Sequence, residues 1–286
     1  HPEMHLEKRL LLDKIDFENG TVEVEGTVYP LKDTNLPTID PADPYRLSPE
    51  EEEVMVALEA SILRSDKLQE HIQFLYSHGA LYKTLNGNLM FHGCIPFTEE
   101  GEFRDVTING ITQHGAKLME HLDKELRDAY FNPPKGKTRA EAANLMWYLW
   151  LGPDSPLFGK DKMTTFERLF IADKATHKEH VVPYYRLINQ KDICVKMIRD
   201  FGLDASHGKI LNGHVPVKIK DGESPIKGGG MLYVIDGGIS KAYQKTTGIA
   251  GYTFIFNSRF MALSEHQPYQ PLRPDGTQEF NTPVIQ

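Results

Sequence analysis

The sequence predicts an α/β fold, for three reasons. Helical patterns fill the middle of the chain, short apolar runs typical of strands lie on either side, and these runs end in loops that carry polar residues. The 286 residues include 40% hydrophobic and 25% charged side chains, which is enough apolar material for a sizeable core. Because open α/β sheets bind ligands at the carboxyl ends of their strands, the residues that follow each strand are the first candidates for function.

The start of the chain is expected to form a β-hairpin and an irregular connection. Residues 10–31 alternate apolar and polar side chains around Asn19-Gly20 and Gly26, and the stretch FENGTVEVEGTVYPL predicts a β-hairpin near a sheet edge. Four prolines then interrupt any regular pattern up to position 49. We therefore separate residues 1–47 from a main domain, residues 48–286, within which a helical segment covers about residues 113–202.

The main domain opens with a well-marked helix and a second hairpin. Ser48 is a good cap, and Glu51 three residues later completes a capping box. We expect this helix to run to Gly79, with a break near Ser65-Asp66. The next stretch, ALYKTLNGNLMFHG, predicts a hairpin that turns at Asn86-Gly87, and its second strand leads directly to a histidine.

Further helices and strands follow in turn. Residues 115–130 predict an amphipathic helix, and EAANLMWYLWLG predicts a largely buried one that begins at a Thr138/Glu141 capping box and ends near Gly152. TTFERLFIADKATHKEH reads as helical, and KDICVKMIRDFG reads as a short helix closed by Gly202. The last third has three β-like runs, KILNGHVPVKI, MLYVIDGG and GYTFIFNSRF, separated by glycine-rich loops.

Charge limits the classes of partner, and cysteine content indicates the cellular compartment. The net charge is −8, from 32 basic and 40 acidic residues, which disfavours nucleic acid and acidic membranes as partners. No apolar run of about 18 residues and no signal peptide is present. The two cysteines, Cys94 and Cys194, are too few for a disulfide framework and fit a cytoplasmic protein. Because the first residue is His1 rather than methionine, we expect the chain not to begin where its gene begins.

Histidine followed by glycine occurs four times, and one instance stands out. Three of the four histidines, His78, His114 and His207, lie beside helix ends or turns and are interpreted as structural. His92 instead follows the apolar strand LMF and precedes Gly93, which allows a tight turn. Such a histidine is either a hydrogen-bonded core residue or a metal ligand.

His214 repeats this arrangement after the strand KILNG. Two histidines at the tips of two strands can converge on one ion, and neutral imidazole suits zinc, manganese and iron. Two ligands are too few for a site, so oxygen ligands are needed as well. His177 and His180 lie three residues apart on an expected helix, where they are either a metal pair or part of a solvated helix end.

A basic, glycine-rich region is the second chemical feature. Between Lys209 and Lys245 six lysines face only three acids, a local balance of 6 − 3 = +3 in an acidic protein. Glycine-rich turns expose backbone N–H groups and lysine adds point charges, so this region either binds phosphate or is a basic surface loop. The spacing matches neither a Walker loop nor a dinucleotide fingerprint.

The motifs together resemble one family. LMFHGCIPF, NGHVPVK and DGGISKAYQKTTGIAGYT, with MWYLWLGPDSPLFGK and KMTTFERLF, are similar to the class III fructose-1,6-bisphosphatases, a branch of the calcineurin-like metallophosphatases. The resemblance implies a layered β-sandwich flanked by helices, present here only as its carboxyl-side part. It also implies two metal ions, commonly Mn²⁺, with His92 and His214 as metal ligands. The phosphate-binding residues it implies are Lys218, Lys241, Tyr243 and Lys245, together with Lys160 or Lys162.

Other parts of the family pattern are absent. The Asp-x-His, Gly-Asp-x-x-Asp-Arg and Gly-Asn-His-Asp/Glu blocks do not occur in this sequence, so we expect them, with the catalytic histidine, upstream of His1. The resemblance implies that the longer enzyme hydrolyses fructose-1,6-bisphosphate in gluconeogenesis and forms a homo-oligomer. The amino-side half of the same enzyme would then be a partner of this chain. The alternatives are a phosphatase of another substrate, such as a phosphoprotein, and a non-catalytic fragment or binding module.

Overall fold

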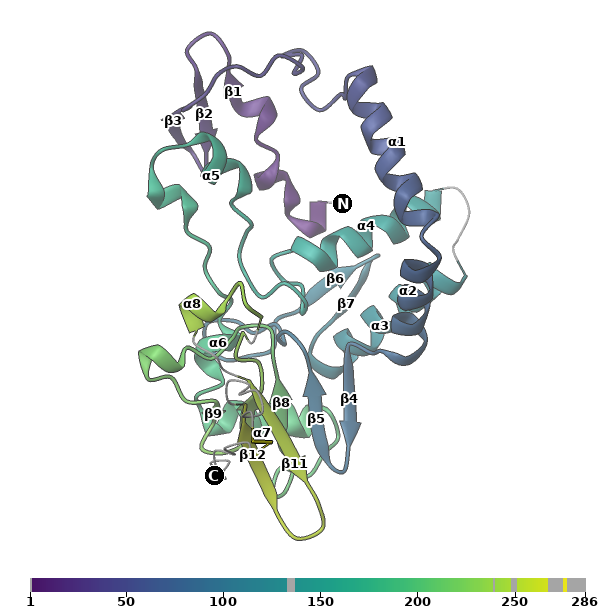
Figure 1. Cartoon of the computed structure of the whole chain (residues 1–286), viewed down its shortest axis with the longest axis vertical. Helices are drawn as coiled ribbons and strands as arrows, with labels where there is room; N and C mark the ends of the chain where they lie inside the picture. The colour runs from purple at the N-terminus through teal and green to yellow at the C-terminus, as the bar shows by residue number, and fades with distance from the viewer. Residues whose placement is uncertain (1, 133–136, 239, 248–250, 267–274, 277–286) are drawn as a thin grey trace. The chain divides into compact units, whose positions relative to one another are not determined.

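The computed structural model describes residues 2–132, 137–238, 240–247, 251–266 and 275–276. It divides into two compact units, and its mixture of helices and small sheets agrees with the α/β class (Figure 1). The first unit comprises His1–Ala80, Thr107–Thr112 and Leu122–Val181, and the second comprises Leu81–Val106, Gln113–His121 and Val182–Gln286. No helix in the described ranges is both long and apolar enough to cross a membrane.

The first unit combines a small antiparallel sheet with helices. Its elements are η1 (Pro2–Met4), η2 (Leu6–Arg9), η3 (Leu12–Lys14), β1 (Ile15–Asp16), β2 (Thr21–Val24), β3 (Thr27–Pro30), α1 (Pro49–Leu63), α2 (Asp66–His78), α4 (Lys137–Leu151), α5 (Thr165–Phe170) and η4 (Lys174–His177). The hairpin β6 (Val106–Ile108) and β7 (Ile111–Gln113) and the helix α3 (Gly115–Phe131) have residues in both units.

The sheet of the first unit is a three-stranded meander rather than the expected hairpin alone. Strand β1 pairs with β2 across the Asn19-Gly20 turn, and β2 pairs with β3 across a second turn at Glu25-Gly26. Gly20 has φ +65° and Gly26 has φ +81°, values that glycine adopts without strain. The buried residues of this sheet join those of neighbouring segments in one core: Leu11, Ile15, Val22, Val24 and Ile171.

The first long helix begins and breaks as the sequence predicts. The Ser48 hydroxyl accepts a hydrogen bond from the Glu51 backbone N–H, and the Glu51 carboxylate accepts one from the Ser48 backbone N–H at 2.8 Å. Helix α1 ends at Leu63 and α2 begins at Asp66, which confirms the break.

Helix α4 is less buried than expected. It ends at Leu151, as predicted, but Trp147 and Trp150 are both more than half exposed, while Tyr148 and Leu149 are buried. The apolar pattern runs around the whole helix, so it could not show which face the fold covers. The expected cap at Thr138 involves a side chain outside the described part of the chain.

The segment after α4 corrects the expectation of one helix carrying His177 and His180. Helix α5 stops at Phe170 because Ile171 is extended and forms a β-bridge with Leu31. A separate 3₁₀ turn ends at His177, and His180 lies beyond it with its Nδ1 2.9 Å from an Asp161 carboxylate oxygen. The two histidines therefore do not share a helix face.

The second unit is built on a five-stranded mixed sheet. Its elements are β4 (Tyr82–Leu85), β5 (Asn88–Phe91), α6 (Tyr184–Leu187), α7 (Lys191–Asp200), β8 (Ile210–Asn212), η5 (Ile219–Asp221), β9 (Ile226–Lys227), β10 (Leu232–Val234), α8 (Gln244–Thr247), β11 (Tyr252–Phe256) and β12 (Met261–Glu265). The strand order is β4-β5-β8-β10-β9, with β5, β8 and β10 mutually parallel. Strands β11 and β12 form a separate hairpin.

Several sequence predictions hold in this unit. The Asn86-Gly87 turn joins β4 to β5, and Gly202, at φ +71°, follows the end of α7. The central strands are mostly apolar and largely buried, with Leu89, Ile210 and Leu232 all 0% exposed.

One buried charge in the first unit gives a stability prediction. Glu167 is 0% exposed, and its carboxylate accepts two hydrogen bonds from Arg9 Nη2, at 2.8 and 3.0 Å. Arg9→Met should lower the free energy of unfolding by about 3 kcal/mol, because it leaves a buried carboxylate without its cation. Urea denaturation measures this change. The double variant Arg9→Met/Glu167→Leu should recover most of the loss, and an equal or larger loss in the double variant would contradict the explanation.

Candidate functional site

The candidate site lies where the parallel strands β5 and β8 end. These strands pair in register, Leu89 with Ile210 and Met90 with Leu211, so both chains leave the sheet at the same edge. His92 comes one residue after β5, and His214 comes two residues after β8. This edge is the carboxyl end of both strands, where open α/β sheets place their ligands.

The two imidazoles lie side by side, as the sequence predicts. His214 Nδ1 is 3.3 Å from His92 Nε2, and the ring centroids are 5.1 Å apart at an interplanar angle of 79°. Each ring therefore turns a nitrogen toward the other. Burial and the neighbouring His214 lower the pKa of His92, while the Asp236 carboxylate acts in the opposite direction. The lowered pKa keeps His92 neutral near pH 7, with one ring nitrogen able to accept a proton, a hydrogen bond or a metal ion.

The backbone around this histidine pair is held in place by a buried amide. Asn212 Nδ2 donates to the carbonyl oxygens of His92, at 3.0 Å, and Gly93, at 2.6 Å, while the Gly213 N–H donates to His92 O at 3.0 Å. Asn212 is 2% exposed, and its Oδ1 has no hydrogen-bond partner among the described residues. A Cβ on Gly213 would lie 3.3 Å from His92 Nδ1, so glycine allows the close approach.

His214 itself has an unusual backbone conformation. Its φ of +69° lies in the left-handed region, which costs a residue with a Cβ on the order of 1 kcal/mol. Such strain is common where a side chain must be aimed at a partner.

Asp236 is a third polar residue at this edge, and the sequence did not single it out as a neighbour of the histidines. It follows β10, which is parallel to β8, and its carbonyl accepts a hydrogen bond from Val217 N at 3.0 Å. Its Cβ lies 3.7 Å from the position of a Cβ on Gly213. The signal was present, since Asp236 also follows a strand in an α/β chain.

No group of three or more His, Cys, Asp or Glu side chains in the described ranges is arranged to hold a metal ion.

The loop that follows Asp236 packs against the segment after His214. A Cβ on Gly238 would lie 3.1 Å from Tyr243 Cβ and 3.3 Å from Pro216 Cβ. Lys220 Nζ donates to Lys245 O at 2.9 Å and ties the same loop from the other side. The predicted phosphate-binding side chains of this region are all exposed: Lys218, Lys241, Tyr243 and Lys245. Residues 239 and 248–250 of the loop motif lie outside the described residues.

Comparison with known proteins identifies the family. The model of the Firmicute fructose-1,6-bisphosphatase family matches residues 1–278. The chain belongs to this family. Class 3 fructose-1,6-bisphosphatases of Clostridium tetani, Clostridium acetobutylicum and Alkaliphilus metalliredigens are 52%, 51% and 51% identical to it over 270, 270 and 271 residues. These matches cover 94% of this chain and 41% of each relative, so the chain spans about two fifths of their length. No solved structure matches it.

In this member of the Firmicute fructose-1,6-bisphosphatase family, Lys160 and Lys162 belong to the first unit and both form ion pairs. Lys160 Nζ lies 2.8 Å from Glu179 Oε2, and Lys162 Nζ lies 2.7 Å from Glu25 Oε1. Burial alone would raise the pKa of Glu179, but hydrogen bonds from Lys160 and Thr164 outweigh it and lower the pKa to about 2. Lys160 therefore has a structural partner as well as a predicted role in phosphate binding.

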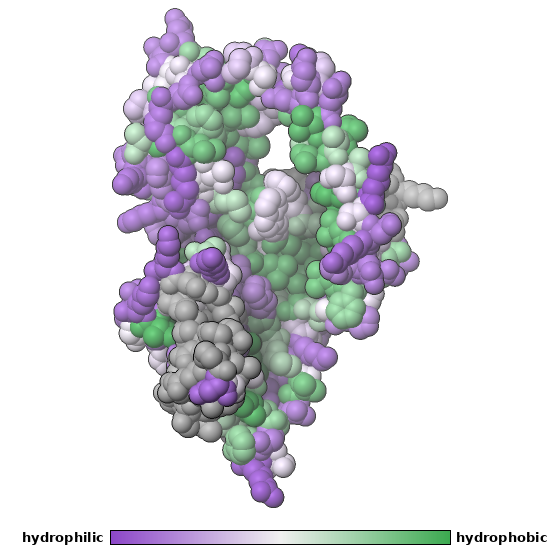
Figure 2. Space-filling view, in the orientation of Figure 1, coloured by the Kyte–Doolittle hydropathy of each residue, from purple (hydrophilic) through white to green (hydrophobic). Residues whose placement is uncertain are grey.

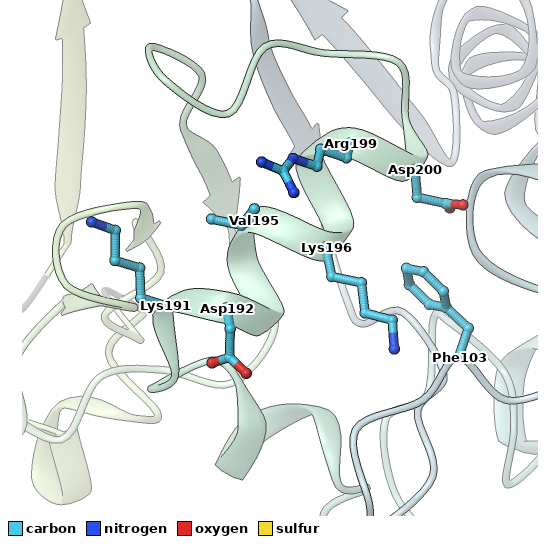
Figure 3. Close-up of a pocket in the computed structure, with 7 residues that line it drawn as sticks. All are labelled: Phe103, Lys191, Asp192, Val195, Lys196, Arg199 and Asp200. Carbon is cyan, nitrogen blue, oxygen red and sulfur yellow. The ribbon is translucent and has the colours of Figure 1, made fainter.

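A hollow of about 850 Å³ lies along α7 and is lined mainly by charged side chains (Figure 3). Lys196 points toward Phe103, with its Nζ 5.4 Å from the ring centroid and 2.5 Å from Glu102 Oε2. The Asp200 carboxylate accepts a hydrogen bond from the Ala116 N–H at 2.6 Å, at the start of α3. Lys196 and Asp200 therefore hold α7 to neighbouring segments. Because these charged groups already have structural partners, we place the candidate site at the histidine pair instead.

The lowered pKa of His92 predicts a pH dependence of stability. The unfolded chain takes up a proton at this residue as the pH falls below about 6.5, whereas the folded chain resists protonation. Stability is therefore insensitive to this group well above that pH, and it declines as the pH falls through that value, from about 7.5 toward 5.5. Urea midpoints measured with EDTA should fall over this range, and His92→Gln should flatten the curve. An unchanged slope in that variant, or a flattening of the same size in the control His207→Gln, would contradict this prediction.

Proposed function

We propose that this chain is the carboxyl-side part of a longer class 3 fructose-1,6-bisphosphatase. That enzyme would hydrolyse fructose-1,6-bisphosphate to fructose-6-phosphate and phosphate, a step of gluconeogenesis in the cytoplasm. The proposal is supported by the identity of about 50% to relatives that carry this name. The observation that carries it is the pair of imidazole nitrogens 3.3 Å apart at the carboxyl edge of the sheet.

The histidine pair fits a shared metal ion. Zinc–imidazole bonds of about 2.0–2.1 Å, for example, would place two ligand nitrogens of one tetrahedral ion about 3.3 Å apart. The observed separation of His92 Nε2 and His214 Nδ1 has this value. The lowered pKa of His92 also favours the neutral form, which is the form that binds metal. We propose His92 and His214 as metal ligands on these grounds.

The remaining ligands would come from elsewhere in the longer protein. Two imidazoles do not complete a site, and the described residues include no cluster of three potential ligands. When bound, a pair of divalent ions such as Mn²⁺ would supply an activated water and neutralise charge on the phosphoryl oxygens. In this chain, Asn212 would orient His92 by fixing the carbonyls of the turn, and the strained backbone of His214 would aim its ring at the same point.

The basic loop is proposed to hold the sugar phosphates. Lys218 lies four residues after His214, and the packing of Gly238 against Pro216 keeps the loop bearing Lys241 and Lys245 beside the same segment. Exposed ammonium groups next to a metal site suit a doubly phosphorylated sugar. Tyr243 would add a hydroxyl donor, and Lys160 is proposed as a further phosphate-binding residue. Hydrolysis by water requires no covalent phosphoenzyme.

Two structural expectations accompany this function. The fold of the complete enzyme would be the layered β-sandwich of calcineurin-like metallophosphatases, to which the parallel strands β5, β8 and β10 would contribute. The complete enzyme would also form a homo-oligomer.

Removal of one imidazole tests the metal assignment. In the full natural polypeptide, His214→Ala should lower kcat/KM for fructose-1,6-bisphosphate at least about 100-fold, because the ion loses a ligand. Titration with Mn²⁺ followed by EPR should show a loss of affinity of similar size. His207→Ala, a matched histidine that also precedes glycine, should leave both quantities unchanged. Full Mn²⁺-dependent turnover in His214→Ala would refute the assignment, and hydrolysis of a phosphopeptide in preference to the sugar bisphosphate would point to another substrate.

Neutralising a loop lysine tests the phosphate assignment separately. Lys241→Met should raise KM for fructose-1,6-bisphosphate about tenfold and change kcat less than about threefold, since it removes binding rather than chemistry. Steady-state kinetics on the full polypeptide measures both constants. The matched control is Lys83→Met, which removes an exposed lysine from β4 of the same unit. Equal KM values for the two variants would exclude this role for Lys241.

A further inference from the structure

Helix α1 exposes all six of its large apolar side chains. None of its residues is buried. Six large apolar side chains are between 49% and 65% exposed: Val54, Met55, Val56, Leu58, Ile62 and Leu63. Figure 2 shows green, hydrophobic side chains on part of the helix that Figure 1 labels α1. A patch of this kind marks a surface that another part of a protein covers.

The apolar residues lie on more than one side of the helix. Val54, Leu58 and Ile62 are spaced by four residues and share one face. Val56 and Leu63 are seven residues apart and share a different face. A helix that is apolar on several sides is typical of the interior of a protein body. One partner helix, including a second copy of α1, would cover one face and leave the other in water.

Charge also argues against a parallel pairing of two copies of α1. The helix begins with four consecutive glutamates, Glu50 to Glu53, and it contains no lysine or arginine. A parallel second copy would place these two acidic ends together, which is unfavourable. The surface that fits this helix is apolar along its length and basic beside its first turn.

The same unit exposes a further apolar pair. Trp147 and Trp150 on α4 are 54% and 58% exposed, with ring centroids 5.1 Å apart. Tryptophan dominates the binding energy of many interfaces, and it is seldom left in water in such a pair. The first unit therefore offers more apolar area than one helix would cover.

We propose that α1 is a docking face for the part of the natural polypeptide that lies outside these 286 residues. The matches cover 41% of each relative, so more than half of each relative's length is available to form a body of domain size. That body would enclose α1 from both faces and place basic side chains near Glu50 to Glu53. The proposal rests on the part of the proposed function that makes this chain a piece of a longer polypeptide, and it does not depend on the substrate.

Cysteine labelling of the full natural polypeptide tests the docking. Both cysteines of this chain are buried, and labelling of the unaltered polypeptide measures the background from any others. A Leu58→Cys variant should react with a maleimide about 100-fold more slowly than a Glu100→Cys control in an exposed turn, because docking protects the helix. A Val56→Cys variant should be protected equally, because the proposal covers both faces. It also serves as the second probe if Leu58→Cys does not fold.

The dependence of protection on protein concentration distinguishes docking within one polypeptide from docking of a second copy of the chain. Protection should be the same at all protein concentrations, since docking within one polypeptide is intramolecular. Protection that grows with concentration would show a second copy of the chain on α1 and overturn the proposal. Labelling of Leu58→Cys and Val56→Cys within a few-fold of the control at every concentration would also overturn it.

Discussion

The parallel pairing of β5 with β8 is the constraint on which the candidate site depends. This pairing fixes where both strands leave the sheet and so brings His92 and His214 together although 121 residues separate them in the chain. If the register of this pairing slipped by one residue, every side chain of the strand would turn to the opposite face of the sheet. The register is protected because Leu89 and Ile210, which face each other across the pair, are completely buried.

The site adds local devices to this constraint. Asn212 ties the turn after β5 to the end of β8, Gly213 removes the Cβ that would crowd His92, and His214 takes a left-handed backbone conformation. The left-handed conformation of His214 carries a cost in stability. Together these features place two nitrogens within 3.3 Å, and the loop after Asp236 then brings lysines to the same segment. Geometry of this kind is expected where function has outweighed local stability.

Local signals in the sequence predicted local structure well. The Ser48 capping box and the Asn86-Gly87 turn depend on neighbouring residues only, and both are present. The histidine pair could be predicted because each histidine follows a strand. Asp236 and the third strand of the first sheet were missed because they depend on which strands pair. The supposed helix through His177 and His180 was wrong because a β-bridge from Leu31 to Ile171 interrupts it.

The central claim is that His92 and His214 bind the same metal ion. Pulsed EPR of the full natural polypeptide loaded with Mn²⁺ measures this directly, because ligand nitrogens couple to the electron spin of the ion. Our account predicts couplings from two imidazole nitrogens at one ion, one of which disappears in His92→Ala and the other in His214→Ala. Bound Mn²⁺ that shows no nitrogen coupling in the unaltered protein would contradict it.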